Sequence, residues 1–306
     1  MKCPICAKSS SLFTQRDGID YFECSDCGSL SADADFLQDV EHGKVKNYGG
    51  EYWHAELIAA RERSFGSSIA RVAELFYYAR IPITRFIDIG SGPGYLLDSL
   101  STLLPELRDL FYAVELSPPD IAYRTKHENF VVGSLGDVHQ KFSIGTCIEV
   151  IEHLTPAILD KLATQMTQRS ESGAIYYIGS GQPEYVKNED PEYLDPLGRG
   201  HVVSYSVKAL RHIFAPYGFT VIPMFGRAWS VLIEYKSTSP VRNAEDLQAR
   251  IWNPVKANTS LLKSGTFGDF LATVGLESAR CYTEHAMCDE RTTWAQSLSN
   301  MIASMR

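Results

Sequence analysis

The sequence has no long apolar segment. No run of apolar residues approaches the roughly 20 that cross a bilayer, and residues 1–6 do not resemble a signal peptide. We therefore expect a cytoplasmic protein that has no membrane partner. The 306 residues also show no internal repeat and no low-complexity tract, and 44% of them are hydrophobic and 22% charged. This composition is typical of an ordinary globular protein.

Positive charge is scarce. The chain has 29 Lys and Arg against 37 Asp and Glu, which gives a net charge of −8. Nucleic-acid-binding proteins usually present a basic face. The charge balance therefore argues against a nucleic-acid partner, although a local basic patch is compatible with this total.

Cysteine is also scarce, yet four of the seven cysteines form a pattern. Cys3 and Cys6 make one C-x-x-C pair, Cys24 and Cys27 make a second one, and 17 residues lie between the two pairs. This spacing falls in the range of a four-cysteine zinc site, in which each pair gives two thiolates to a tetrahedral metal. Two disulfides are not expected in a reducing cytosol, and a thioredoxin-like site needs one such pair beside a βαβ pattern. We expect structural zinc.

Two short strands are expected between the cysteine pairs, at residues 11–13 and 19–22, with a turn at residues 16–18. A unit this small has almost no core, so that the metal holds it folded. The pattern resembles a zinc ribbon, which we expect to be a structural cap or a dimer contact, with substrate recognition as the alternative. The acidic residues 31–50 are interpreted as a linker that ends in a glycine turn.

A glycine-rich turn follows a short apolar run in the middle of the sequence. Residues 86–89 are typical of a buried parallel strand, and Gly90, Gly92 and Gly94 alternate with other residues after it. Glycine lets the backbone turn sharply and lets a ligand approach closely. We expect Asp88 to end the strand and to point into the crevice where open α/β sheets bind ligands. The next apolar run closes on Glu115, whose carboxylate can accept both hydroxyls of a ribose.

The spacing of the turn distinguishes between nucleotide cofactors. Tyr95 stands where the dinucleotide pattern G-x-G-x-x-G has its third glycine, and the absence of a following Lys-Ser or Lys-Thr excludes a P-loop. The pattern from Asp88 to Gly94, together with Glu115, resembles the class I S-adenosylmethionine (SAM)-dependent methyltransferases. The resemblance implies that the glycine turn passes under the amino-acid part of SAM and that Glu115 holds the ribose. The alternative is a turn that serves only the fold.

Further cofactor contacts are implied by the same resemblance. Many relatives place an acid just after the third strand, expected here at residues 129–132, near the adenine amino group. This chain has Ser134 there and Asp137 three residues later, which departs from the family pattern. The expected cofactor-binding residues are Asp88, Gly90, Ser91, Gly92, Gly94, Tyr95, Glu115, Leu116, Ser134, Leu135 and Glu149.

A second motif, Glu149-Val-Ile-Glu152-His153, follows the apolar residues 146–148. Ionisable side chains at the end of an apolar strand are costly unless they are satisfied or used. The motif resembles that of the ubiquinone-biosynthesis O-methyltransferases, a family in which a Glu-x-x-Glu-His run and a later histidine, here His201, can bind a divalent cation. A hydroxyl needs a general base or a metal ion to become a nucleophile.

The resemblance implies that the catalytic residues are His153, Glu152 and His201. It also implies a second divalent site, for Mg or another ion, formed by Glu149, Glu152, His153 and His201. The competing interpretation is that the two glutamates bind the backbone and that His153 alone acts as the base. Aromatic and basic residues that are candidates for shaping the pocket are Tyr48, Tyr52, Trp53, Tyr185, Tyr193 and Arg199.

The flanking segments complete the expected organisation. Helices are expected at residues 54–78, 207–217, 264–274 and 291–305, an edge hairpin at 220–225 and 229–235, and a long loop at 180–200. The predicted fold class is α/β. Residues 1–45 form the zinc ribbon and linker, residues 46–235 a Rossmann-like seven-stranded methyltransferase sheet, and residues 236–306 a helical C-terminal extension.

The predicted function is O-methylation of a small molecule, such as a sugar, a glycan precursor or a secondary metabolite, with SAM as the cofactor. The partner is then a small-molecule acceptor, and the C-terminal extension either packs on the acceptor side or forms a homodimer contact. One alternative is an RNA methyltransferase whose ribbon grips RNA. The other is a catalytically idle SAM-fold module whose ribbon docks a partner.

Overall fold

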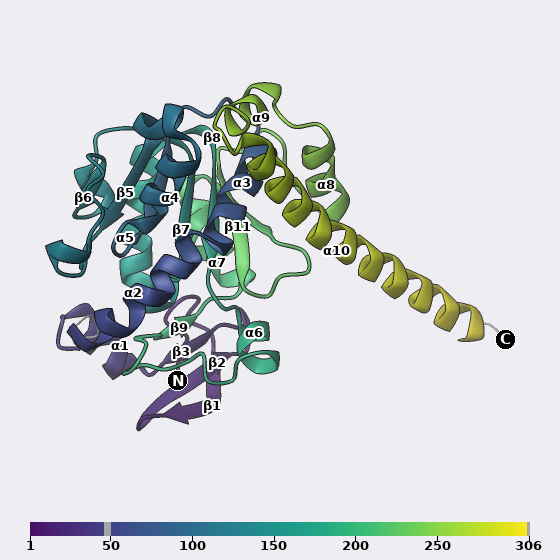
Figure 1. The fold of residues 1–306 in the computed structure, drawn as a ribbon. Helices are drawn as coiled ribbons and strands as arrows, with labels where there is room; N and C mark the ends of the chain where they lie inside the picture. Colours follow the sequence, from purple (N-terminus) through teal and green to yellow (C-terminus); the bar gives the residue numbers. More distant parts are fainter. Residues whose placement is uncertain (46–49, 305–306) are drawn as a thin grey trace.

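A seven-stranded sheet forms the central layer of the computed structural model, which describes residues 1–45 and 50–304 (Figure 1). Its strand order is β10-β11-β8-β7-β4-β5-β6. The strands are β4 (Phe86–Ile89), β5 (Phe111–Glu115), β6 (Phe130–Val132), β7 (Phe142–Ile148), β8 (Ser170–Gly179), β10 (Phe219–Pro223) and β11 (Ser230–Tyr235). All neighbours pair in parallel except those of β11, which is antiparallel to both β8 and β10. The predicted fold class, with its antiparallel hairpin at the sheet edge, is confirmed.

Helices cover both faces of the sheet, because its central strands carry apolar side chains on both sides. On β8, Tyr176 and Ile178 pack in one cluster with α5 (Pro156–Arg169) and α7 (Val207–Phe214). Their neighbours Ile175 and Tyr177 pack in the other cluster, with α3 (Ser67–Tyr78), α4 (Tyr95–Leu103) and the C-terminal helices. The carboxyl ends of the parallel strands are left for the connecting turns.

The N-terminal residues form a second, smaller sheet in the order β1-β2-β3-β9. Strands β1 (Ser10–Arg16) and β2 (Ile19–Cys24) are the expected ribbon hairpin, and Asp17 and Gly18 have positive φ at its turn. Strand β3 (Leu30–Ala32) pairs on its other side with β9 (Val203–Ser204), which comes from the middle of the chain. The smaller sheet, which we call the ribbon sheet, is therefore completed by the segment of the chain that connects β8 with α7.

The interpretation of residues 31–50 as a linker was wrong. The segment contains the end of β3 and helix α1 (Ala34–Glu41), whose first turn is capped by the Asp33 carboxylate accepting from the Phe36 N–H at 2.9 Å. Leu37 anchors α1 in the core. The acidic residues thus cap and solvate a short helix. Gly50 begins the next helix, and Tyr48 lies outside the described residues.

Two other expected elements differ from the structure. The helix expected at residues 54–78 is divided into α2 (Gly50–Ser64) and α3, because Gly66 between them has φ −126° and ψ −107°, outside the helical region. The long loop at residues 180–200 contains helix α6 (Pro183–Asn188), which Pro183 starts without needing a backbone N–H. Helix α7 ends at Phe214, and residues Ala215–Tyr217 tighten into a 3-10 turn.

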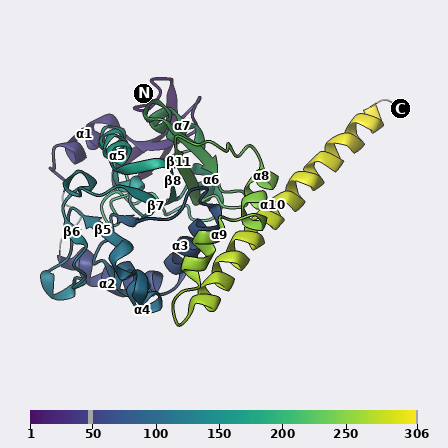
Figure 2. The same cartoon turned by 90° about the horizontal axis from the view of Figure 1, so that it is seen from above.

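The C-terminal extension consists of helices, as predicted, but they are arranged differently. Helix α8 (Ala244–Trp252) begins after Asn243, whose side chain caps it by accepting from the Asp246 N–H, and α9 (Lys256–Leu262) follows it. The two expected later helices form one long helix, α10 (Gly268–Ser304), which packs on α3 and α8 and then projects away from the body (Figures 1 and 2). None of the described helices combines the length and the apolar character needed to cross a membrane.

Candidate active site and zinc centre

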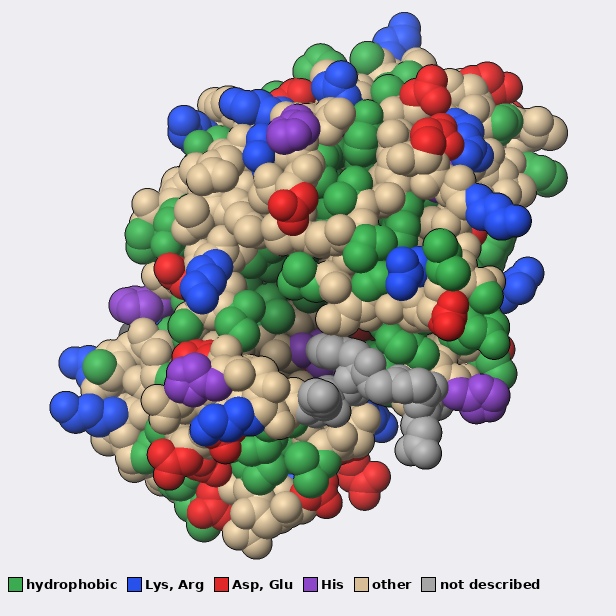
Figure 3. Space-filling view, turned by 90° about the vertical axis from the view of Figure 1, so that its left-hand side faces the viewer, with side chains coloured by type: hydrophobic (Ala, Val, Ile, Leu, Met, Phe, Trp, Pro, Cys, Tyr) green, Lys and Arg blue, Asp and Glu red, His purple; other side chains and the backbone are tan. Residues whose placement is uncertain are grey.

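A cavity of about 660 Å³ opens at the carboxyl ends of β4, β5 and β7, beneath α2. Figure 3 shows a hollowed face of the molecule with hydrophobic and histidine side chains visible in the hollow. Most of the predicted site residues line this cavity. They are Asp88, Gly90, Ser91, Gly92, Glu115, Leu116, Ser134, Leu135, Glu149, His153 and His201. The cavity lining does not include Gly94, Tyr95 or Glu152.

The two ends of the glycine turn require glycine, because of their backbone conformation and their close neighbours. Gly90 has φ +71°, and a Cβ there would lie 2.4 Å from Cγ2 of Val150. Gly94 has φ +78° at the start of α4, and a Cβ there would lie 2.4 Å from Cγ2 of Thr125. Only the first of these positions lines the cavity, whereas glycine at position 94 is required by the packing of the turn.

The two acids of the motif occupy different surroundings. The Glu115 carboxylate accepts from the N–H groups of Gly92 and Ser117, each at 2.8 Å, and burial raises its pKa. Each of its oxygens keeps a second lone pair for a ligand hydroxyl. Asp88 lies inside β4, not at its end as expected, and its carboxylate accepts from the Thr146 hydroxyl at 2.7 Å. Burial raises the pKa of Asp88 to about 7.

The segment after β6 is shaped by a capping interaction. Both the N–H and the hydroxyl of Ser134 donate to the Asp137 carboxylate at 2.8 Å. Ser134 and Leu135 thereby line the cavity, whereas Asp137 is used to cap the short helix that follows. The acid at this position thus holds the turn in place.

Glu152, His153 and His201 come together from distant parts of the sequence. His153 ends the 3-10 turn Ile151–His153 after β7, and His201 lies two residues before β9. The Oε1 atom of Glu152 lies 4.0 Å from Nε2 of His153 and 3.9 Å from Nε2 of His201. Glu152 is 0% exposed, and neither of its carboxylate oxygens has a hydrogen-bond partner among the described residues. We call these three residues the Glu–His cluster.

The backbone fixes the tautomers of both histidines. Nδ1 of His153 lies 3.1 Å from the carbonyl oxygen of Gly200, and Nδ1 of His201 lies 2.7 Å from that of Tyr193. A carbonyl only accepts, so each Nδ1 carries the proton, and in the neutral ring the lone pair is then on Nε2. Burial lowers the pKa of His153 to about 4 and that of His201 to about 3, which keeps both rings neutral at pH 7.

The cluster has the donor set of a divalent cation site. Its three ligand atoms lie within 4.8 Å of one another. Two metal–ligand bonds of about 2.0–2.2 Å span up to about 4.4 Å, and the distances of 4.0 and 3.9 Å from Oε1 of Glu152 to the two Nε2 atoms lie within that span, so that a cation can lie between the carboxylate and either imidazole. It would also supply the partner that the buried Glu152 carboxylate lacks. The residues present therefore fit a cation.

Glu149, expected as a fourth ligand, is not part of the cluster. It lines the cavity, its N–H donates to the Gly179 carbonyl at 2.8 Å, and its backbone has φ +54°. A non-glycine residue in the left-handed region is strained, and such strain is often found at functional sites. Burial raises the pKa of its carboxyl.

Some polar residues of the cavity were not predicted from the sequence. Arg63 on α2 lines the cavity and pairs with Glu56 of the same helix, and Lys161 and Gln165 approach from α5. These residues lie on ordinary helices. No local sequence pattern shows which turn of a helix faces a cavity and which turn faces solvent. The candidates Tyr52, Trp53 and Arg199 do line the cavity, whereas Tyr185 and Tyr193 do not.

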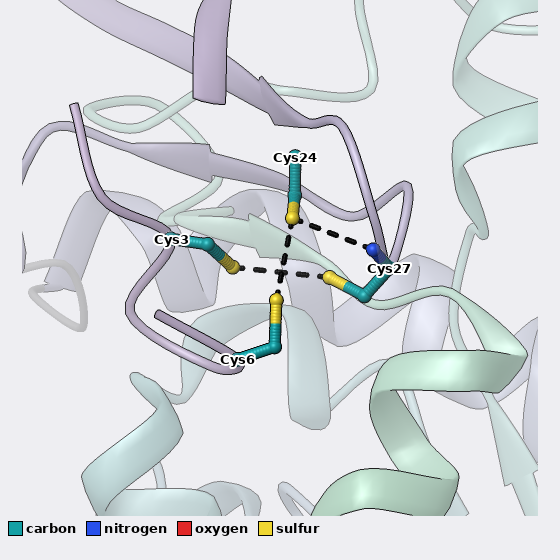
Figure 4. A group of neighbouring side chains, drawn as sticks. All are labelled: Cys3, Cys6, Cys24 and Cys27. Atoms are coloured by element: carbon teal, nitrogen blue, oxygen red, sulfur yellow. Dashed lines mark hydrogen bonds between the residues drawn. The ribbon is translucent and has the colours of Figure 1, made fainter. Parts of the chain in front are cut away.

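The four N-terminal cysteines converge as predicted (Figure 4). Sγ of Cys3 lies 3.8 Å from Sγ of Cys27, and Sγ of Cys6 lies 3.4 Å from that of Cys24. Zinc–sulfur bonds of about 2.3 Å place the sulfurs of a tetrahedral site about 3.8 Å apart. The N–H of Ile5 donates to Sγ of Cys3, and the N–H groups of Asp26 and Cys27 donate to Sγ of Cys24. None of the four is in a disulfide, and the arrangement fits zinc.

Comparison with known proteins gives similarity in fold only. No family model and no curated protein matches the sequence. The DesVI protein of Streptomyces venezuelae superposes with a TM-score of 0.46 and 14% identity, over 60% of this chain and 98% of that chain. An amino pentose methyltransferase from Micromonospora echinaspora, solved with SAM bound, superposes with a TM-score of 0.45 and 16% identity, over 63% of this chain and 99% of that chain. A sugar N-methyltransferase from Streptoalloteichus superposes with a TM-score of 0.44 and 13% identity, over 60% of this chain and 93% of that chain. These similarities, all at low identity, concern the arrangement of helices and strands alone.

Proposed function

We propose that this protein is a SAM-dependent methyltransferase that methylates a hydroxyl group of a small molecule. The observation that carries the proposal is that one cavity joins a cofactor-type site to the Glu–His cluster. The glycine turn follows β4, and Glu115 ends β5 on one side of it, whereas His153 follows β7 on the other side. A nucleoside held at the β5 side would place its reactive group beside the histidines.

The cofactor side is built to hold a nucleoside. When bound, SAM supplies a methyl group on a positively charged sulfur. Gly90 and Gly92 line the cavity where its amino-acid part would lie, and the remaining lone pairs of Glu115 can accept the two ribose hydroxyls. Ser134 and Leu135 line the part of the cavity where the adenine base would lie, beyond the ribose.

The acceptor side supplies what a hydroxyl needs. His153 is neutral, and its Nε2 lone pair can take the proton of a hydroxyl as the methyl group is transferred. Where a cation is bound, Glu152, His153 and His201 would hold it, and it would lower the pKa of a hydroxyl. Carboxylate and imidazole ligands suit Mg, Mn, Fe or Zn.

The size and charge of the site favour a small acceptor. About 660 Å³ is within the range of small-molecule sites and has to admit both cofactor and acceptor. We propose a sugar, a glycan precursor or a secondary metabolite. For an RNA acceptor held by the ribbon, residues 1–45 would need a basic surface, but they contain four Lys or Arg and eight Asp or Glu.

Replacing Glu115 by glutamine is expected to weaken SAM binding by about 10-fold to 100-fold, because a charged acceptor for hydroxyl groups contributes about 1.5–3 kcal/mol. Glutamine keeps the shape of the side chain and one carbonyl oxygen for the backbone. Calorimetric titration of SAM measures the effect, with Glu106→Gln, an exposed glutamate away from the cavity, as the control. Equal affinity in both variants would remove Glu115 from the cofactor site.

We further propose that the projecting part of α10 pairs with a second copy of the chain. Its described side chains from Arg291 to Ser304 are all exposed. Trp294, Leu298, Met301 and Ile302 recur three or four positions apart and so share one face. Arg291 is the only charged residue between 291 and 304. Two copies of this face can meet without the like-charge repulsion that an acidic chain would otherwise cause.

Trp294→Glu is expected to convert a dimer into a monomer, because it removes the largest side chain of the shared apolar face and places a carboxylate on that face. Light scattering after size exclusion reports the mass, which for one chain is 34.1 kDa. Gln296→Glu adds the same charge on the opposite side of the helix and is expected to leave the dimer intact. A wild-type protein that stays monomeric at high concentration would contradict the pairing.

A further inference from the structure

The ribbon sheet and the Glu–His cluster share a segment of the chain. Strand β9 begins two residues after His201 and pairs with β3 through Leu30 with Ser204 and Ser31 with Val203. The N–H of Ala32 also donates to the carbonyl of Val202 at 2.9 Å. The residues that follow His201 are therefore the outer strand of the zinc ribbon sheet.

The ribbon also contacts His201 itself. The hydroxyl of Tyr21, on β2, donates to the carbonyl oxygen of His201 at 2.6 Å, and Tyr21 is 0% exposed. The next residue, Val202, donates its N–H to the carbonyl of Glu152 at 2.8 Å. The backbone of the ribbon-bound segment is thus joined to two of the three cluster residues.

The far end of the segment is attached to the second cysteine pair. The Ser206 hydroxyl donates to the carbonyl of Cys27, and the Ser206 N–H donates to the hydroxyl of Ser29 at 2.9 Å. The Ser206 hydroxyl also caps α7 by accepting from the Ala209 N–H. Residues 201–206 are therefore held at one end by Tyr21 and at the other by a proposed zinc ligand.

A second contact reaches the segment of the other histidine. The Glu41 carboxylate, at the end of α1, accepts from the hydroxyl of Thr155 at 2.6 Å, and Thr155 caps α5 two residues after His153. None of the described residues from 1 to 45 lines the cavity. The N-terminal part thus contacts both histidine-bearing segments without reaching a ligand in the cavity.

We propose that the zinc ribbon is a positioning element of the active site and that Tyr21 is the residue through which it positions His201. Residues 199–202 precede β9 in an irregular segment, and an irregular segment needs support from its neighbours to hold a ligand atom in place. The ribbon provides that support. Occupancy of the zinc centre then determines how well Nε2 of His201 meets Glu152 and His153.

The test uses Tyr21→Phe in the full-length, zinc-loaded protein. Loss of one buried hydrogen bond of about 1 kcal/mol predicts about a fivefold weaker affinity of Mn²⁺ for the Glu–His cluster. Mn²⁺ is the probe because it prefers oxygen ligands such as carboxylate over thiolates and so leaves the zinc centre alone. Free Mn²⁺ is measured by electron paramagnetic resonance. Zinc content should stay at one per chain, and SAM affinity should stay within twofold. Ser206→Ala should weaken Mn²⁺ binding in the same direction.

The matched control is Tyr176→Phe. This tyrosine is also fully buried, but its hydroxyl bonds to Ser170, at the opposite end of β8 from the cavity. It is expected to lower stability without changing Mn²⁺ affinity. Equal Mn²⁺ affinity in Tyr21→Phe and wild type, or an equal loss in Tyr176→Phe, would overturn the positioning function.

The proposal rests on the proposed function only for its effect on turnover. If the wild type binds no Mn²⁺, the ring resonances of His201, assigned with His201→Gln, provide the readout instead. They are expected to shift in Tyr21→Phe and to stay unchanged in Tyr176→Phe. Unshifted resonances in both variants would reject the ribbon as a positioning element, whereas failure to bind SAM would reject the proposed function and leave this readout intact.

Discussion

His153→Ala is expected to lower the rate of methyl transfer by about 10²-fold to 10⁴-fold, the usual contribution of a general base, with SAM affinity within a few fold of wild type. The imidazole lies at the β7 side of the cavity, away from Glu115, and its Nε2 atom is 4.0 Å from Oε1 of Glu152. Removing the imidazole takes away a proton acceptor and also one of the three possible metal-ligand atoms of the Glu–His cluster. The cofactor contacts remain.

The measurement is single-turnover transfer at saturating SAM, to an acceptor found by screening hydroxylated sugars and phenols. Mn²⁺ titration distinguishes the two uses of the side chain. A ligand function predicts a loss of cation affinity of 10-fold or more, and a pure base function predicts none. His139→Ala, an exposed histidine outside the cavity, is the control. Unchanged turnover in His153→Ala would remove this residue from the mechanism.

Cys24→Ser is expected to release zinc and to unfold the ribbon locally. Three thiolates and a hydroxyl hold zinc far less well than four thiolates, and structural zinc contributes about 10–16 kcal/mol to the folding of small zinc modules. Tyr21 and Leu30 still join the larger core, so the main sheet should survive while the thermal midpoint and the solubility fall.

Elemental analysis and thermal unfolding measure these changes. Cys281→Ser replaces an exposed cysteine on α10 and should keep one zinc per chain. Full retention of zinc in Cys24→Ser would refute the assignment of the four cysteines to one metal centre.

The cofactor side could be predicted from the sequence because its signals are local. A parallel strand that ends in alternating glycines fixes the turn at Gly90, and the next parallel strand must bring Glu115 to the same edge of the sheet. The same reasoning does not show which side of the turn each residue faces, and the structure leaves Gly94 and Tyr95 outside the cavity lining. The second divalent site was predicted by resemblance, and the structure brings three of its four expected residues together in the Glu–His cluster.

The remaining features depend on contacts between distant residues. Strand β9 has two residues and pairs with the ribbon, and no pattern in such a short segment reveals its partner. The hydrogen bond from Tyr21 to His201 joins residues 180 positions apart. Helix α1 was missed because its acidic composition resembles a linker, although Asp33 caps it and Leu37 anchors it. In each case tertiary contacts determine the structure.

The central claim is that the cavity binds SAM beside the Glu–His cluster. Calorimetric titration of SAM and S-adenosylhomocysteine into the purified protein, before and after EDTA and with elemental analysis of the sample, tests it most directly. We predict a micromolar Kd, about −8 kcal/mol, with one zinc per chain. Absence of binding by a folded, zinc-loaded protein would contradict the claim and would favour a catalytically idle module that docks a partner.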